Sequence, residues 1–183
     1  MLRKLLLVVL LLVVILVGYA STKPDTFAVE RSIDIAAAPE RVHAQIDDFH
    51  AWEAWSPWAR LDTAMTVTYS GAASGPGAIY EWKGNSTVGA GRMEITSSVP
   101  GTSVDIKLDF LEPIEGHNTT TFTLTPANGG THVRWFMEGE ATLLTKLMLV
   151  FTSMDRMIGP DFERGLQQLK TVSESPATGA TTP

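Results

Sequence analysis

Alternation of apolar and polar side chains predicts a series of β-strands through the middle of the chain. In residues 103–110, Val104, Ile106, Leu108 and Phe110 share one face, while polar and charged side chains share the other. Half-buried antiparallel strands show this two-residue period. Turn-forming Gly, Pro and Asn residues separate one such run from the next. We predict strands near residues 27–35, 65–70, 78–83, 90–98, 103–110, 118–125 and 132–140.

Apolar residues recur at helical spacing in two further segments. A short helix is predicted from Pro39 to Ile46, because proline suits the first position of a helix. A longer apolar stripe runs over residues 144–169. We expect a kink or a break at Pro160 within it, because proline lacks the N–H donor that a helix needs. Phe151 lies at the centre of the stripe, so we expect it to face the sheet and to be deeply buried.

These elements predict an α+β fold. A single antiparallel sheet with one apolar face needs a cover, and the long C-terminal helix is the only predicted element large enough to supply it. The folded unit is expected to span residues 27–170. Small polar residues, Pro and Gly make up most of residues 171–183, which predicts a disordered tail.

The N-terminal segment is predicted to contact a membrane. Arg3 and Lys4 precede an apolar run that extends over residues 5–20. Residues 1–22 therefore fit either an uncleaved signal anchor or a signal peptide that is cleaved before Ser21. Both interpretations keep the positive end in the cytoplasm and export the remainder. We expect a single-pass protein of the cytoplasmic membrane with its domain on the extracytoplasmic side, or a secreted protein. A buried core helix is a third interpretation.

Composition excludes several classes of function. The chain of 183 residues carries 20 acidic and 14 basic residues, for a net charge of -6, which argues against binding of nucleic acid. It contains no cysteine, which excludes disulfides and thiolate metal sites. The four histidines are scattered, and the glycines lack the Gly-Lys-Ser/Thr ending of a phosphate-binding loop. We therefore expect neither a metal nor a cofactor.

Four short motifs follow one another along the chain. They are Ala38-Pro39-Glu40-Arg41-Val42, Trp52-x-x-Trp55-Ser56-Pro57-Trp58, Gly75-Pro76-Gly77 followed by Tyr80-Glu81-Trp82, and Gly159-Pro160-Asp161-Phe162-Glu163-x-Gly165-Leu166-x-x-Leu169-Lys170. In this order they resemble the START/SRPBCC superfamily, and most of all its polyketide cyclase/dehydrase-like branch. The resemblance covers roughly residues 27–170 and departs from the family pattern at Pro160. It implies a helix-grip fold, in which a curved antiparallel sheet of about seven strands wraps on the C-terminal helix.

The resemblance also implies a cavity between sheet and helix that takes an apolar small molecule or a lipid. Aromatic rings and methionines supply contact area and adapt to the shape of a ligand. Any one of these side chains could instead simply fill the core, and the Trp-rich segment could serve only to fasten an irregular loop. Trp55 is the strongest candidate for ligand contact. The expected ligand-binding residues are Trp55, Trp58, Met93, Ile106, Leu108, Phe122, Trp135, Met137, Met148, Phe151 and Met154.

Residues suited to catalysis are sparse. Glu81 and Glu138 are candidates for general acid–base work if they point into the cavity, where burial would raise their pKa. The sequence does not fix which way they face. Three functions therefore remain open: an apolar-ligand carrier, a cyclase/dehydrase-type enzyme with an inward carboxylate, and a binding-only partner module with a filled cavity. An apolar lining favours the first, an inward ionisable group the second, and a packed interior the third.

Overall fold

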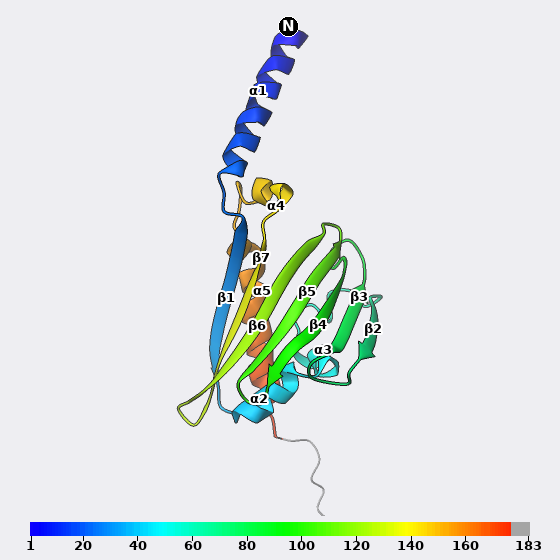
Figure 1. Ribbon diagram of the computed structural model, residues 1–183, viewed down its shortest axis with the longest axis vertical. Helices are drawn as coiled ribbons and strands as arrows, with labels where there is room; N and C mark the ends of the chain where they lie inside the picture. The colour runs from blue at the N-terminus through cyan, green and yellow to red at the C-terminus, as the bar shows by residue number, and fades with distance from the viewer. Residues whose placement is uncertain (177–183) are drawn as a thin grey trace, which may run out of the picture.

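Seven antiparallel strands form one sheet in the computed structural model, which describes residues 1–176 of the chain (Figure 1). The strand order is β1-β7-β6-β5-β4-β3-β2, so the first strand pairs with the last and the others follow as hairpins. This confirms the predicted α+β helix-grip fold. The strands are β1 (Thr26–Ile35), β2 (Thr66–Gly71), β3 (Ala78–Lys83), β4 (Ala90–Val99), β5 (Ser103–Glu112), β6 (Gly116–Ala127) and β7 (Gly130–Glu140).

The helices lie at the ends and behind the sheet. In Figure 1 the long helix α5 lies behind the sheet, α2 and α3 lie at its lower end, and α1 projects from the upper end beside α4. The predicted short helix from Pro39 to Ile46 is confirmed as α2. The helices are α1 (Leu2–Ser21), α2 (Pro39–Ile46), the 3-10 turn η1 (Phe49–Ala51), α3 (Trp52–Trp55), α4 (Leu143–Met148) and α5 (Met154–Glu174).

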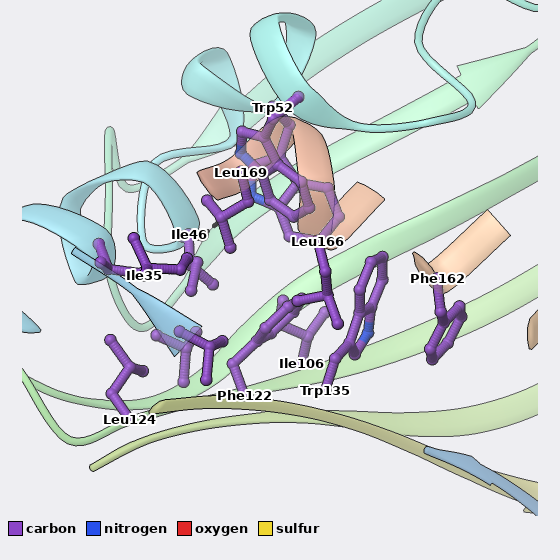
Figure 2. Close-up of a cluster of buried hydrophobic side chains, with 14 of the residues drawn as sticks. Ile35, Ile46, Trp52, Ile106, Phe122, Leu124, Trp135, Phe162, Leu166 and Leu169 are labelled. Atoms are coloured by element: carbon purple, nitrogen blue, oxygen red, sulfur yellow. Dashed lines mark hydrogen bonds between the residues drawn. The ribbon is translucent and has the colours of Figure 1, made fainter. Parts of the chain in front are cut away.

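The packed core occupies the half of the domain next to α2 (Figure 2). Ile106 and Phe122 point from the sheet toward Leu166 and Leu169 of α5, and Ile46 of α2 closes the cluster at one side. All five side chains are at most 2% exposed. Burial of one such side chain contributes roughly 1.5–3 kcal/mol, so this cluster supplies much of the stability that fixes α5 against the sheet.

The predicted C-terminal helix breaks at a different place from the one expected. Residues 149–153 separate α4 from α5, whereas Pro160 lies inside α5 without ending it. The side chain of Ser153 accepts a hydrogen bond from the backbone N–H of Arg156, 3.2 Å away, and caps the start of α5. Phe151 therefore lies in the connecting turn and is 77% exposed. The prediction that Phe151 is deeply buried against the sheet is wrong.

An arginine joins the first strand to the last helix. Arg31 on β1 contacts Asp155 at 2.6 Å (Nη1 to Oδ1) and Glu163 at 2.7 Å (Nε to Oε1), both on α5. A Cβ atom on Gly159 would lie 2.2 Å from the Arg31 guanidinium, so the glycine leaves the space that this side chain occupies. The hydrogen bonds raise the pKa of Arg31 above its ordinary value, and the guanidinium stays charged while it holds α5 to the sheet edge.

The ends of the folded unit differ slightly from the prediction. Helix α5 continues to Glu174, and Ser173 is fully buried, so residues 171–174 belong to the domain rather than to a disordered tail. Residues 177–183 of the predicted tail lie outside the described residues. At the other end, four residues, 22–25, connect α1 to β1. Within residues 1–176, α1 is the one helix long and apolar enough to cross a bilayer.

Candidate ligand-binding cavity

A cavity of about 750 Å³ lies between the inner face of the sheet, the first half of α5 and the loop 56–65. Ligand sites for small molecules commonly have volumes of roughly 300–1,000 Å³. Aromatic and aliphatic side chains make up most of the wall, and polar or charged side chains are concentrated in the loops. The wall residues are Trp52, Glu53, Ser56, Trp58, Ala59, Arg60, Asp62, Thr63, Met65, Val67, Tyr69, Tyr80, Trp82, Thr87, Val88, Met93, Leu108, Phe110, Thr120, Trp135, Met137, Ile158 and Phe162.

The cavity occupies the half of the domain nearer to α1. Leu108 and Phe110 lie toward the end of β5 that is remote from α2, and Met137 lies toward the end of β7 that leads to α4. In Figure 1 these strand ends point toward the part of the molecule where α1 and α4 lie. The domain is thus packed solid at its α2 end and hollow at the opposite end.

Part of the predicted lining does face the cavity. Trp58, Met93, Leu108, Trp135 and Met137 all belong to its wall. They come from the Trp-rich loop and from three different strands, as the alternation of the strands predicts. Thus the period-2 pattern identifies the correct face of the sheet.

The remaining predicted lining residues lie elsewhere. Trp55, Ile106 and Phe122 are each 0% exposed and belong to the packed core below the cavity. Met148 and Phe151 precede α5, and Met154 is its first residue, so all three lie beyond the cavity wall. The prediction that these residues line the cavity is therefore wrong. Ile106 and Phe122 share the inner face of the sheet with the wall residues but lie nearer to α2, where that face is packed. Met148, Phe151 and Met154 lie outside the wall because the chain breaks between α4 and α5.

The Trp-rich segment is fastened to α2 by two of its tryptophans and contributes a third to the cavity wall. The indole N–H groups of Trp52 and Trp55 each donate to a backbone carbonyl near the end of α2, at 2.9 Å. These bonds fasten the irregular segment to the domain, as one of the two interpretations predicted. Trp58 instead borders the cavity and packs edge-on against Trp135 and Phe162, with ring centres 5.9 and 6.2 Å apart. Of the three tryptophans in this motif, Trp52 and Trp58 border the cavity and Trp55 does not.

Several wall residues were not among the predicted site residues. Tyr69 lies on β2, Tyr80 and Trp82 lie on β3, and Phe162 lies on α5. Tyr80 and Trp82 are two residues apart on β3 and therefore share one face of the strand. The same two-residue period that identifies the inner face of β5 also identifies these two residues. Phe162 stacks on Trp135 with ring centres 4.1 Å apart, which makes this pair a corner of the cavity (Figure 2).

One buried donor in the wall has no partner. The Nε1 atom of Trp135 is buried, and no residue among those described accepts a hydrogen bond from it. In Figure 2 this nitrogen lies on the side of the ring nearer to Phe162 and away from Phe122. By contrast, the indole of Trp82 donates to the carbonyl of Val88 at 3.1 Å. A buried donor left unpaired costs roughly 1–3 kcal/mol. The same burial closes this nitrogen off from the cavity, so an acceptor atom of a ligand reaches it only after a neighbouring side chain such as Phe162 moves.

The phenol of Tyr80 provides a second polar group in the wall. Burial, followed by the nearby Tyr69 and Glu53, raises the pKa of Tyr80 to about 12. The hydroxyl therefore keeps its proton at neutral pH and is available as a donor. Its ring lies 5.6 Å from that of Tyr69, edge-on, which fixes its position in the wall.

The two candidate catalytic carboxylates lie on the outer face of the sheet. Glu81 is exposed and alternates with the wall residues Tyr80 and Trp82, and Glu138 is exposed and follows the wall residue Met137. Glu81 lies opposite Arg92 of β4 in the register of the sheet, on the face that does not border the cavity. The carboxylates that do border the cavity are Glu53 on α3 and Asp62 in the loop 56–65.

Asp62 ties the loop 56–65 in place over the cavity. Its carboxylate accepts backbone N–H bonds from Ala64 at 3.0 Å and from Asn85 at 2.8 Å. The second bond connects this loop to the turn between β3 and β4. Both of these loops contribute to the wall, so Asp62 holds together the two segments that cover the outer end of the cavity.

Comparison of the fold with solved structures gives several matches over most of the chain. The CV1439 protein from Chromobacterium violaceum is 20% identical, covers 84% of this chain and 99% of its own, and superposes with a TM-score of 0.58. Aha1 from Colwellia psychrerythraea, solved as a dimer, is 17% identical over 84% and 99%, with a TM-score of 0.58. Ara h 8.0201 is 13% identical over 81% and 97%, with a TM-score of 0.57. At these identities the likeness concerns the fold.

No functionally curated protein is a significant sequence match to this chain. A family model described as "Polyketide cyclase / dehydrase and lipid transport" matches residues 26–174. This range begins with the first strand of the sheet and ends with the last residue of α5. The match therefore covers the whole domain and the cavity described above. The chain belongs to the polyketide cyclase/dehydrase and lipid transport family.

Proposed function

We propose that this protein is a membrane-tethered, exported domain that binds an apolar small molecule or a lipid in its cavity. The observation that carries the proposal is the hollow of about 750 Å³ with a wall made largely of aromatic and aliphatic side chains. Such a site provides apolar contact area, while a few polar groups orient the ligand. Membership of a family that includes lipid transport supports the same function.

The polar groups of the wall narrow the chemistry of the ligand. The unpaired Nε1 of Trp135 and the protonated hydroxyl of Tyr80 are both donors. A ligand with an apolar body and an acceptor oxygen, such as a carbonyl, ester or quinone, would accept a hydrogen bond from Tyr80, and one from Trp135 once the neighbouring Phe162 ring moves aside. A pure hydrocarbon would leave the Trp135 donor unpaired and lose the free energy of that hydrogen bond.

The other two functions receive less support from the geometry. The proposed acid–base residues Glu81 and Glu138 are exposed on the outer face of the sheet and do not belong to the cavity wall. A partner module with a packed interior is disfavoured by the volume of the cavity. The carrier function needs neither an inward carboxylate nor a filled interior.

The location of the domain rests on α1. This helix of 20 residues exposes leucine and valine side chains on all sides, which suits a lipid environment. Arg3 and Lys4 at its start favour a cytoplasmic N-terminus, so the cavity domain would lie outside the cytoplasm. Retention of α1 as an anchor makes the protein a tethered rather than a free carrier.

Native mass spectrometry of the full chain, released from detergent micelles, tests ligand binding directly. We expect a co-purified apolar molecule that survives removal of the detergent. Leu108→Trp fills part of the cavity and should abolish this mass difference. Leu111→Trp on the same strand is the matched control, because Leu111 is 55% exposed and lies outside the cavity wall. Equal ligand retention by both variants would contradict a site in this cavity.

A further inference from the structure

Three large apolar side chains are exposed at the end of the domain that carries α1. Leu143 and Leu144, at the start of α4, are each 50% exposed, and Phe151, in the turn after α4, is 77% exposed. We call these three residues the α4 patch. Single exposed apolar residues are ordinary, but a group of large ones in nine consecutive residues points to an interaction surface.

The α4 patch lies beside the last turns of the apolar helix α1. Helices α4 and α1 are in contact, and Figure 1 shows α4 next to the lower end of α1. This end of α1 carries Tyr19, which is 52% exposed, with the ammonium group of Lys23 lying 4.8 Å from the centre of its ring. Tyrosine is enriched where a membrane helix meets the membrane–water interface. The patch therefore lies at the level of the membrane surface when α1 spans the bilayer.

The position of α4 relative to α1 is fixed by the connecting residues. Lys146 of α4 is buried and forms an ion pair with Asp25, the last residue before β1. The backbone N–H of Ala141 donates to the carbonyl of the same Asp25 at 2.7 Å. Two contacts thus hold the start of α4 to the four-residue connection that follows α1, and the patch cannot move far from the membrane surface.

We propose that the α4 patch inserts into the interfacial layer of the bilayer that α1 spans. This inference rests on the proposed membrane tether. The patch continues the apolar surface of α1, so lipid is the occupant that can cover both. Without Arg3 and Lys4 the chain has 12 basic and 20 acidic residues, so attraction to anionic lipid does not drive the contact. Burial of leucine and phenylalanine side chains drives it.

This second contact would set the orientation of the domain. A single helix followed by a short connection leaves the domain free to tilt. An additional insertion point beside it fixes the hollow end of the domain, with the cavity, toward the membrane surface. An apolar ligand would then pass between the bilayer and the cavity with less exposure to water.

Site-specific fluorescence of the full chain in phosphatidylcholine vesicles tests the proposal. The chain has no cysteine, so a single introduced cysteine can carry an NBD fluorophore without background labelling. Phe151→Cys reports on the patch, and Leu11→Cys reports on the middle of α1. Val99→Cys is the matched control, because Val99 is 49% exposed and lies at the end of β4, in the hairpin that contacts α2. Emission is compared in vesicles without doxyl lipid and in vesicles whose lipids carry the doxyl quencher at a shallow position, for residue 151, and at a deep position, for residue 11.

We expect NBD at residues 151 and 11 to emit at shorter wavelength and to lose intensity with the doxyl lipid, while NBD at residue 99 does neither. The loss at residue 151 should persist at high salt, because the contact is apolar. Quenching at residue 11 without quenching at residue 151 would overturn the proposal and leave the tether intact. Absence of quenching at residue 11 would overturn both. A shielded but unquenched probe at residue 151 would indicate contact with protein instead of lipid and would also overturn the proposal.

Discussion

Gly165 shows how the absence of one side chain sets the distance between α5 and the sheet. A Cβ atom at this position would lie 2.8 Å from the Trp135 ring and 3.0 Å from the ring of Pro57. Both neighbours are held on their other sides, Trp135 by its stack with Phe162 and Pro57 by the Trp-rich segment. The glycine of the closing motif therefore has a packing role.

Gly165→Ala should lower the free energy of unfolding by about 1–3 kcal/mol, because α5 or the Trp135 ring must shift to admit the methyl group. Urea unfolding of the full chain in detergent measures this change. Gly116→Ala is the control, because the nearest atom to its added Cβ lies at 4.0 Å. A Gly165→Ala variant as stable as Gly116→Ala would contradict the close approach of α5.

Trp135→Phe separates the two roles of the Trp135 ring. The variant keeps an aromatic ring against Phe162 and removes the unpaired Nε1 donor. If a long-chain ketone displaces the Phe162 ring and accepts from Nε1, its binding should weaken by about 2- to 12-fold, the value of one ordinary hydrogen bond. Binding of the alkane of equal length should change far less. Competition experiments that show the same loss for both ligands would assign Trp135 a purely apolar role.

At the scale of elements, the apolar stripe over residues 144–169 forms two helices, α4 and α5, instead of one. The apolar positions continue through residues 144–169, but the chain leaves the helix at 149–153 and starts again with Ser153 as a cap. Periodicity alone cannot detect such a break, because apolar spacing persists across it. The signal that was available is local: Ser153 is a good helix cap, and Asp155 is an acidic residue in the first turn.

The phenylalanines of the domain should respond to truncation in order of their packing. Phe122→Ala should cost about 3–5 kcal/mol, because Phe122 is fully buried in the packed core. Phe162→Ala should cost less, because Phe162 already borders a void. Phe151→Ala should stay within roughly 0.5 kcal/mol of the native chain. Unfolding by urea ranks the three, and a large loss for Phe151→Ala would contradict its exposed position.

The link between β1 and α5 predicts a dependence of stability on pH. The hydrogen bond from Arg31 holds the pKa of Asp155 below its ordinary value of 3.8. The folded carboxylate thus keeps its charge to lower pH than the unfolded one. Its contribution to stability is complete above about pH 4 and is lost as the pH falls through the lowered pKa.

Arg31→Gln should therefore reduce stability at pH 7 and make the loss below pH 4 less steep. Urea unfolding of both proteins between pH 3 and pH 7 measures the two slopes. Parallel curves for Arg31→Gln and the native chain would show that Arg31 does not couple to this titration.

At the scale of the whole molecule, the sequence predicts the fold well and the site less completely. Alternation identifies each strand to within a few residues, because one face of the sheet is buried and the other solvated. It cannot tell Ile106, which is packed, from Leu108, which borders the cavity, because both are apolar and share one face. Only the position of α5 above the sheet decides where packing ends and the cavity begins.

The orientation of the protein in the membrane can be tested with C-terminal reporters. If, as proposed, α1 crosses the membrane once with Arg3 and Lys4 on the cytoplasmic side, the C-terminus should be outside the cytoplasm. Alkaline phosphatase fused there in a bacterial host should be active, and a reporter that works only in the cytoplasm should be inactive. The opposite pattern would reject export. A mature protein that begins at Ser21 would keep export and reject the anchor.

The four residues between α1 and β1 limit how far the cavity can travel. A fully extended connection of this length spans at most about 14 Å, and Asp25 is additionally tied to α4. If the domain is the proposed carrier and α1 stays in the bilayer, the short connection prevents it from crossing an aqueous compartment with its ligand. It would then take up and release the ligand at the membrane surface, and a partner that receives the ligand would have to approach the membrane.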